Sequence, residues 1–303
     1  MGHDIAHPGL TNNFQINART DMALTYNDIS CLENFHCSTL FAVAKSPENN
    51  IFERFNVSEY KMLRKRIIPM ILATDMFNHG KVIDNIKNKV KTISDKINGD
   101  FTINEKIQKY FKEFTEEQNQ AKFDNQQVFL DYFIHASDLA HNTKLFKISL
   151  KWVELLSCEF WLQGDLERSM GLDISFLCDR NTTDVPKSQV GFISNMIIPT
   201  FNILIDNFPT LSYMVENANT NMNIWKDLQS KGRKRGWTPP KEDAKNDVPK
   251  CPVIHNSNSK NVSHTTKNIH KNYINLKKNY VFNNGKSFFE KAKFIVINTG
   301  SNN

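Results

Sequence analysis

Residues 149–167 read SLKWVELLSCEFWLQGDLE, and this stretch decides the fold class. Its apolar positions recur three or four residues apart, at Leu150, Val153, Leu156 and Phe160. That spacing places them on one face of an α-helix, and Ser149 is a suitable N-cap for its start. No segment of the chain shows the long alternation of apolar and polar residues between turns that marks a sheet of hairpins. The sequence therefore predicts an all-α protein.

Three other segments show helical patterns: residues 60–79, 126–139 and 186–207. The third has the expected signals at its ends, with Asp184 near its start, Pro186 in its first turn and Pro209 just beyond its end. Pro199 lies inside it, and we expect a kink there because proline has no backbone N–H to donate.

Charge divides the chain into two parts. The 303 residues have a formal net charge of +6, with 38 Lys and Arg against 32 Asp and Glu. Residues 230–303 hold 15 of the basic and 4 of the acidic residues, so residues 1–229 hold 23 and 28 and have a net charge of −5. We expect one folded domain in residues 1–229 and a largely disordered, Lys- and Asn-rich tail in residues 230–303. The mildly acidic domain argues against a nucleic-acid-binding groove, which needs a basic face.

Composition also indicates a polar segment and a cellular compartment. Residues 94–125 are polar, and we expect a solvated segment there with one amphipathic helix around residues 103–114. The five cysteines are odd in number and form no Cys-x-x-Cys pair, which is typical of free thiols in a reducing compartment. No signal peptide and no run of 18 apolar residues stands out. We expect a cytoplasmic chain without a membrane segment, unless an upstream region of a longer parent protein anchors it.

The first residues contain metal-ligand side chains, His3-Asp4 followed by His7-Pro8-Gly9. If this segment is helical, Asp4 and His7 share a face, and Pro8 and Gly9 end the helix. An imidazole and a carboxylate can bind one divalent cation, and the second carboxylate oxygen is then free to bridge to another. A surface or capping role is the alternative for an isolated His-Asp pair. Asp138 supports the metal hypothesis, because it lies among apolar and small residues where a charge needs a cation or a partner.

Six motifs occur in order along the chain: HDxxHPG at 3–9, YNDxSxLENxH at 26–36, ATDM at 73–76, ASDL at 136–139, EFxxQGDxE at 159–167 and KSQVGF at 187–192. Together they resemble the catalytic domain of class I 3',5'-cyclic nucleotide phosphodiesterases, from His3 to about Leu228. The resemblance implies a multi-helix catalytic fold in residues 1–229, in which residues 94–125 are an insertion because this stretch is longer than is usual in the family. It also implies hydrolysis of cAMP or cGMP to the 5'-monophosphate, in cyclic nucleotide signalling.

Such hydrolysis needs an activated water and stabilised phosphoryl oxygens, and two divalent ions about 3.5 to 4 Å apart supply both. We expect His3, Asp4 and Asp138 to bind the first ion, zinc by its donor types. Asp4 would bridge to a second ion, magnesium or manganese, with a bridging hydroxide as the nucleophile. The resemblance adds three side chains that hold the waters of the second ion: His7, Glu33 and Thr74. An ordinary helix face and a cap are the alternatives for Glu33 and Thr74.

The base of the nucleotide needs different contacts. Gln189 offers one acceptor and two donors that can pair with a purine edge, and Phe192, three residues on, can stack against the base. The resemblance implies these two roles and adds the walls of the pocket: Leu139, Leu156, Phe160, Met76 and Leu177. A hydrophobic core explains Leu156 and Met76 equally well. Because a glutamine amide can rotate, cAMP and cGMP both stay open.

Two features depart from the family pattern. The family has an upstream His-Asn-x-x-His motif that supplies another metal ligand and the acid for the leaving 3' oxygen, and this chain has no such motif. We therefore expect an N-terminally truncated domain with reduced or no activity, since general acid catalysis contributes about 10² to 10⁴ in rate. His141-Asn142 replaces the usual Asn-Pro near the base, so nucleotide preference does not carry over.

Two other functions stay open. One is a non-catalytic cyclic-nucleotide-binding or regulatory protein that keeps Asp4, Asp138 and Gln189. The other gives residues 230–303 a role in binding nucleic acid or anionic membrane, where the simpler interpretation is a solvated tail. The sequence leaves the oligomeric state open.

Overall fold

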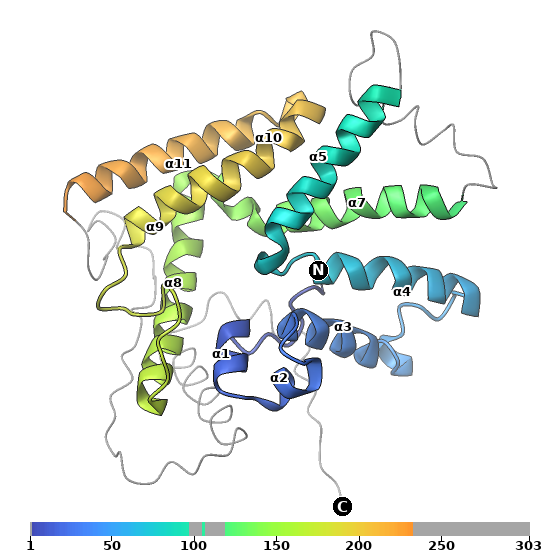
Figure 1. Ribbon diagram of the computed structural model, residues 1–303, viewed down its shortest axis with the longest axis horizontal. Coiled ribbons are helices and arrows are strands. Elements are labelled where there is room, and N and C mark those ends of the chain that lie inside the picture. Colours follow the sequence, from blue (N-terminus) through green and yellow to red (C-terminus); the bar gives the residue numbers. More distant parts are fainter. Residues whose placement is uncertain (1, 97–104, 107–118, 233–303) are drawn as a thin grey trace, which may run out of the picture.

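The computed structural model describes residues 2–96, 105–106 and 119–232, and every regular element in this part of the chain is helical (Figure 1). The α-helices are α1 Asn12–Asn17, α2 Asp21–Tyr26, α3 Cys31–Val43, α4 Val57–Leu72, α5 His79–Lys96, α7 Asn119–Asp138, α8 Phe146–Met170, α9 Val185–Phe192, α10 Ile198–Asn207 and α11 Tyr213–Ser230. Short 3₁₀ segments are η1 Pro47–Asn49, η2 Met76–Asn78, η4 Leu139–Thr143 and η6 Pro209–Leu211, and η5 Ile193–Ile197 is a π-helix. The all-α prediction is confirmed.

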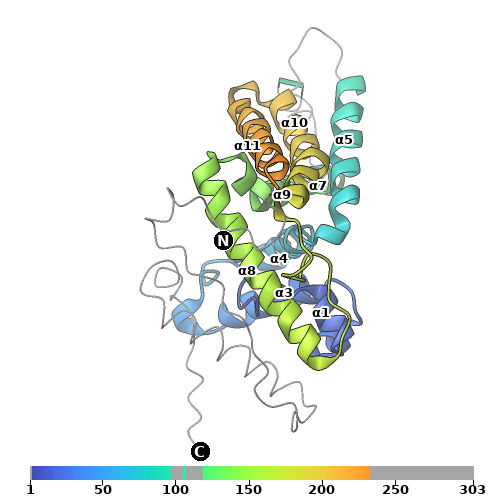
Figure 2. The same ribbon diagram turned by 90° about the vertical axis from the view of Figure 1, so that its left-hand side faces the viewer.

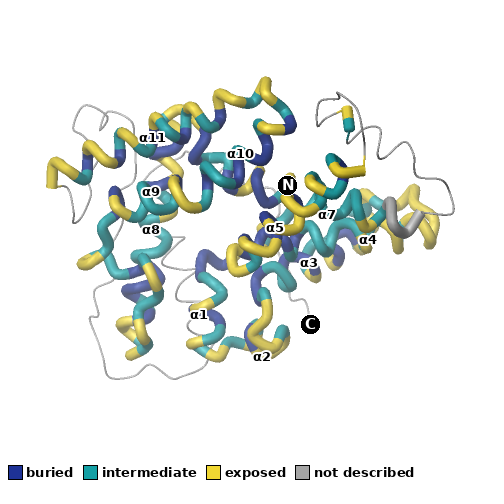
Figure 3. Tube along the Cα trace, turned by 45° about the horizontal axis from the view of Figure 1, so that its top comes forward, coloured by how far each residue is buried: buried dark blue, intermediate teal, exposed yellow. Residues whose placement is uncertain are grey.

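Helix α8 contributes to two hydrophobic clusters, and it runs from the neighbourhood of α11 to that of α1 (Figures 1 and 2). In its N-terminal half, Leu150 and Val153 belong to the main core, which also draws on α5, α7, α10 and α11. In its C-terminal half, Cys158 and Leu162 pack against Phe14 of α1. Buried and exposed residues alternate along α8 and α11 in Figure 3, so each helix turns one face to the interior.

Helix α8 confirms the helix predicted at residues 149–167 but begins earlier. Its N-cap is Leu145, and Ser149 is fully buried inside the helix, so the predicted Ser149 cap is wrong. The reason lies in the first turn, where the Phe146 ring packs on Trp225 with 5.4 Å between ring centroids. This contact to α11 places the start of α8, and periodicity along α8 does not reveal it.

The helix predicted at residues 60–79 is divided in two by the structure. Helix α4 begins at Val57, after a capping box in which Asn56 and Glu59 exchange side-chain and backbone hydrogen bonds. It ends at Leu72, and the side chain of Asp75 then accepts a hydrogen bond from the Phe77 N–H to begin η2. Helix α5 follows from His79. The prediction failed because the helix is interrupted at two polar residues, Thr74 and Asp75. The apolar residues on either side of them keep a helical spacing, which hides the interruption.

The helix predicted at residues 186–207 is confirmed with one irregularity. Asp184 caps α9 by accepting a hydrogen bond from the Lys187 N–H, as its position suggested. The disturbance expected at Pro199 occurs just before it, as the π-helix η5 between α9 and α10. A proline has no N–H for the regular pattern, and a π-turn is one way in which a helix accommodates such a defect.

One segment of the described residues, Val185–Asn207, is long and apolar enough to cross a membrane by length and composition, with a mean hydropathy of 1.3. Core helices of soluble proteins pass the same test, so one such segment is weak evidence. Ile193, Ile197 and Phe201 of this segment are buried in the main core. Burial of these side chains fits a core helix.

Two predicted regions fall largely outside the description. Of residues 94–125, α5 extends to Lys96 and α7 begins at Asn119. The amphipathic helix predicted around residues 103–114 lies almost wholly outside the described residues, as do residues 233–303 of the predicted tail. Helix α11 runs to Ser230, and the domain boundary near residue 229 stays a prediction.

Helix α11 holds η4, the segment that follows Asp138. Asn221 is buried, and its Nδ2 donates to the carbonyl oxygens of Asn142 and Lys144 at 2.9 and 2.8 Å. Asn217 Nδ2 donates to the Thr143 carbonyl at 3.0 Å. These bonds fix the connection between the end of α7 and the start of α8.

Replacing Asn221 by Ala should lower the free energy of unfolding by about 1 to 3 kcal/mol, because two carbonyl oxygens lose their donor. Urea denaturation measures the change. Asn219→Ala is the control, since Asn219 Nδ2 donates to Val215 within the same helix, and its effect should stay within about 0.5 kcal/mol. Equal effects of the two substitutions would contradict the role given to Asn221.

The pH dependence of stability should reflect His141. Burial lowers the pKa of His141 to about 4, against the attraction of the Asp138 charge, while an unfolded histidine titrates near pH 6.5. The stability contribution is therefore complete above about pH 6.5 and falls as the pH drops towards 4, because the unfolded chain takes up the proton first. His141→Gln should show a smaller loss of Tm over this interval, measured by circular dichroism in EDTA. Parallel Tm curves would contradict the assignment.

Candidate metal centre

Residues 3–6 form a turn, so the helix considered for this segment is absent. The His7 N–H donates to the Asp4 carbonyl at 3.1 Å, and Ala6 and Gly9 adopt positive φ values of 59° and 76°. Pro8 supplies the physical reason, since the residue before a proline is disfavoured in helical geometry. Pro8 and Gly9 are buried, and they close the turn as predicted, although no helix precedes them.

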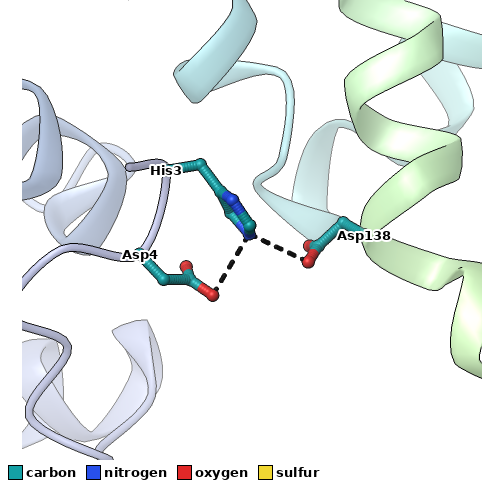
Figure 4. Close-up of side chains that lie close together, drawn as sticks. All are labelled: His3, Asp4 and Asp138. Carbon is teal, nitrogen blue, oxygen red and sulfur yellow. Dashed lines mark hydrogen bonds and ion pairs between the residues drawn. The ribbon is translucent and has the colours of Figure 1, made fainter. Parts of the chain in front are cut away.

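The turn brings His3 and Asp4 to Asp138 at the end of α7 (Figure 4). His3 Nε2 lies 3.0 Å from Asp138 Oδ1 and 3.2 Å from Asp4 Oδ2. One ligand atom from each of the three side chains lies within 4.8 Å of the other two. The structure therefore brings together all three residues predicted to bind the first ion, across 135 positions of sequence.

The charges of this trio depend on one another. The hydrogen bond to Asp138, and then the one to Asp4, raise the pKa of His3 to about 10 in the absence of a metal ion. Burial alone would raise the pKa of Asp4, but the hydrogen bond from His3 and the nearby histidine charges together hold it below its ordinary value. A proton on His3 thus compensates two carboxylates, and a cation binding between them must replace it.

The donor set fits a divalent ion. Zinc binds imidazole nitrogen and carboxylate oxygen at about 2.0 to 2.2 Å, so two donors on one ion lie about 3 to 4 Å apart. The nitrogen–oxygen separations of 3.0 and 3.2 Å are close to this range. The trio is also partly open, with His3 and Asp138 side chains 23% and 34% exposed, which leaves room for further ligands.

Two more histidines adjoin the trio. His36 is buried, its Nδ1 donates to the Ile5 carbonyl at 2.8 Å, and its Nε2 lies 3.8 Å from Asp4 Oδ1. The His7 ring stacks on His36 with 5.5 Å between centroids. His7 Nδ1 accepts a hydrogen bond from the Gly9 N–H at 2.9 Å, so the neutral ring carries its proton on Nε2. His7 therefore presents a donor, which matches its predicted role of holding a water.

Glu33 is directed by Asn12. Asn12 Nδ2 donates to Glu33 Oε2 at 3.0 Å, and Asn12 Oδ1 accepts from the Leu32 N–H at 2.9 Å. Burial raises the pKa of Glu33, against the Asn12 hydrogen bond, and the charges of Asp75 and Asp4 add to the rise. The negative charge of Asp4 thus contributes to the raised pKa of Glu33, as expected for a group close to the candidate metal centre.

Thr74 lies at the end of α4 and is buried. Its hydroxyl donates to the Ile71 carbonyl at 2.7 Å, so the lone pairs of Oγ1 stay available to accept a hydrogen bond from a water. Its neighbour Asp75 is also buried, and Asp75 Oδ2 accepts from the Ser30 hydroxyl at 2.7 Å. The predicted roles of Glu33 and Thr74 agree with these contacts and stay predictions.

Helix α8 fixes the segment that follows the turn at residues 3–6. Gln163 is buried, its Oε1 accepts from the Thr11 N–H at 2.8 Å, and its Nε2 donates to Glu167 at 2.9 Å. A Cβ atom on Gly164 would lie 1.9 Å from the Cys178 carbonyl oxygen, so glycine alone allows this close approach. Gln163 and Gly164 of the QGDxE motif therefore fix two segments against α8, one at Thr11 and one at Cys178.

The residues predicted to contact the base lie on α8, α9, η2 and η4 and in the turn at Leu177. Gln189 and Phe192 are half-buried on α9, and Gln189 Oε1 has no hydrogen-bond partner among the described residues. Leu139 is buried, and Phe160 and Leu177 are half-buried. Met76 and Leu156 are 39% and 40% exposed, so neither is a core residue in the structure. Their pocket role stays a prediction.

Sequence reasoning missed three residues near these groups. His36 follows Glu33 by three positions and so shares its helix face, a signal that the LENxH motif contained. Trp152 is 45% exposed one turn before Leu156 on α8, and its ring centroid lies 6.3 Å from that of His141. Asn12 gave no signal beyond its place after the HDxxHPG motif.

Comparison with known proteins gives consistent matches. The sequence profile of the 3'5'-cyclic nucleotide phosphodiesterase family matches residues 1–218. The cGMP-specific 3',5'-cyclic phosphodiesterase alpha of Plasmodium falciparum (isolate 3D7) is 34% identical over 238 residues, which cover 77% of this chain and 22% of that protein. The 3',5'-cyclic-AMP phosphodiesterase, isoform F, of Drosophila melanogaster is 37% identical over 204 residues, 67% of this chain and 28% of that protein.

Among solved structures, the phosphodiesterase domain of the RhoPDE fusion protein from the choanoflagellate Salpingoeca rosetta matches with a TM-score of 0.64 at 29% identity. The match covers 77% of this chain and 67% of that chain. The chain thus spans about two thirds of a solved phosphodiesterase domain and less than a third of the two curated relatives.

Asp138→Asn should weaken zinc binding by at least about 100-fold, because removal of a direct ligand should cost more than the 10- to 100-fold typical of outer partners. Competition with a chromogenic zinc chelator measures the affinity. Wild-type affinity should rise with pH, since zinc must displace the proton of His3. Asp84→Asn, at an exposed position on α5, is the control and should leave the affinity unchanged. Equal zinc affinity in the two variants would exclude the trio as a zinc site.

Proposed function

The chain belongs to the 3',5'-cyclic nucleotide phosphodiesterase family, and on that premise we propose that residues 1–229 bind two divalent ions and hydrolyse a cyclic nucleotide to its 5'-monophosphate. The observation that carries the proposal is the convergence of His3, Asp4 and Asp138 at one point. Family membership implies divalent metals in general, and zinc with magnesium or manganese is the finer part of the proposal.

The residues of the chain divide the work between holding ions and holding waters. His3, Asp4 and Asp138 would hold the first ion, and a carboxylate oxygen of Asp4 would be available to a second. When bound, the ions supply an activated water and stabilise negative charge on the phosphoryl oxygens. His7 can donate a hydrogen bond to a water through Nε2, and Thr74 can accept one from a water through its hydroxyl oxygen. The two residues therefore orient waters in different ways. Asn12 keeps Glu33 in one orientation beside them.

Gln189 is the proposed base-recognition residue. Its Oε1 is buried and has no hydrogen-bond partner among the described residues, an arrangement that costs about 1 to 3 kcal/mol unless a ligand or water completes it. A purine edge with a neighbouring donor and acceptor can do so. The relatives named above act on cGMP in one case and on cAMP in the other, so we propose a purine cyclic nucleotide without choosing between them.

We also propose a cytoplasmic location for the part of the chain described here. Cys31, Cys37, Cys158 and Cys178 are buried, and no disulfide joins any of these described cysteines, which supports a reducing compartment. No part of the proposal depends on residues 233–303.

The test is hydrolysis of cAMP and cGMP by the 303-residue chain with zinc and manganese. We expect slow turnover of at least one nucleotide, because this sequence has no His-Asn-x-x-His motif to supply the general acid. Asp138→Ala should lower kcat/KM further by at least about 100-fold, the scale on which the loss of one electrostatic stabiliser acts. Gln189→Ala should weaken binding of a fluorescent cyclic nucleotide by about tenfold or more. Gln229→Ala, near the end of α11, is the matched control and should bind as the wild type does.

The two assays separate the functions. Binding without turnover would contradict hydrolysis and support a regulatory, nucleotide-binding protein. Absence of both binding and turnover would contradict both functions. Turnover that survives Asp138→Ala would show that hydrolysis does not use the trio.

A further inference from the structure

A buried pair of histidines joins the start of α5 to α7, one turn before Asp138. His79 is the first residue of α5, and His135 lies in α7, and they are 9% and 1% exposed. His79 Nδ1 lies 2.9 Å from His135 Nε2, and His135 Nδ1 lies 2.8 Å from the Ala73 carbonyl oxygen. None of the predicted metal or substrate roles includes either histidine.

The hydrogen bonds in this pair run in one direction. A carbonyl oxygen only accepts, so His135 Nδ1 must carry a proton and donate it to Ala73. Burial lowers the pKa of both histidines, which favours neutral rings. In a neutral ring with its proton on Nδ1, His135 Nε2 is an acceptor, and His79 Nδ1–H is its donor. The chain of donation is therefore His79 to His135 to Ala73.

This chain of hydrogen bonds joins two parts of the proposed site. The peptide between Ala73 and Thr74 is held on one side by His135 and on the other by the Thr74 N–H, which donates to the Ile71 carbonyl at 3.1 Å. His135 is also three residues before Asp138, so both residues lie within one turn of α7. One imidazole thus connects the peptide of Thr74 to the helix turn that carries Asp138.

We propose that His135 and His79 are positioning residues that set the separation between Thr74 and Asp138, and through it the affinity of the site for the second divalent ion. The inference rests on the proposed function, because it assumes that Thr74 holds a water of that ion. A partner that orients a metal-binding group typically changes metal affinity 10- to 100-fold. His79 acts through His135, because its hydrogen bond fixes which nitrogen of the His135 ring carries the proton.

The experiment measures manganese binding to the 303-residue chain by electron paramagnetic resonance, with one equivalent of zinc present to fill the first site. His135→Leu removes the donor to Ala73 and should weaken manganese binding by at least about tenfold. His135→Asn places an amide N–H where Nδ1–H was, and should recover affinity to within about threefold of the wild type. His79→Leu should give a smaller loss than His135→Leu, because the bond to Ala73 remains.

Tyr132→Phe is the matched control. Tyr132 is buried one turn earlier on α7, and its hydroxyl donates to a backbone carbonyl, that of Thr200, at 2.8 Å. Its removal should lower stability as the loss of one hydrogen bond does, with manganese affinity unchanged. A general packing effect would instead reduce manganese affinity in this variant as well, and that result would overturn the inference.

The outcomes separate this inference from the proposed function. A wild-type chain that binds neither zinc nor manganese would remove the proposed function and this inference with it. Wild-type binding with unchanged affinity in His135→Leu, or with no recovery in His135→Asn, would overturn the inference alone. If the leucine variants do not fold, the imidazole ¹⁵N spectrum of the wild type decides: it should show His135 protonated at Nδ1 and bare at Nε2, and the opposite tautomer would overturn the inference.

Discussion

The site depends on one electrostatic constraint, which is that two carboxylates must face the same ring nitrogen. Asp4 and Asp138 both lie within 3.2 Å of His3 Nε2, and two like charges at such a point need a proton or a cation between them. Much of the surrounding structure serves to keep them there. Asn221 of α11 fixes the segment after Asp138, and Gln163 of α8 fixes the segment after His7.

The trio also links elements that belong to different hydrophobic clusters. Asp138 ends α7, which packs against α4 and α5. The turn at residues 3–6 leads into α1, whose Phe14 packs on α8. A shift of α8 relative to α7 would therefore change the distance between Asp4 and Asp138. In such an arrangement, the packing of the hydrophobic clusters determines the distances between the side chains of the polar site.

Periodicity and motif order predicted most of the fold and the membership of the trio, because both depend on residues close in sequence or on a recognisable pattern. Three features were not predicted, and two of them share a common reason. The start of α8 depends on Trp225, the orientation of Glu33 depends on Asn12, and the break between α4 and α5 depends on polar residues inside an apolar pattern. The contacts of Trp225 and of Asn12 join separate elements, and the local sequence around either partner does not predict them. His36 differs, since its spacing from Glu33 did contain the information.

Gly164 has a consequence for how the protein tolerates change. One added methyl group would meet the Cys178 carbonyl oxygen, and α8 would have to move away from the chain around residue 178. Gln163 is the neighbouring residue, and through Thr11 it reaches the segment that carries His7. A substitution at Gly164 would therefore displace the segment that carries His7, although Gly164 itself lies on α8. In a screen of random variants, substitutions at this position should resemble substitutions in the candidate metal centre.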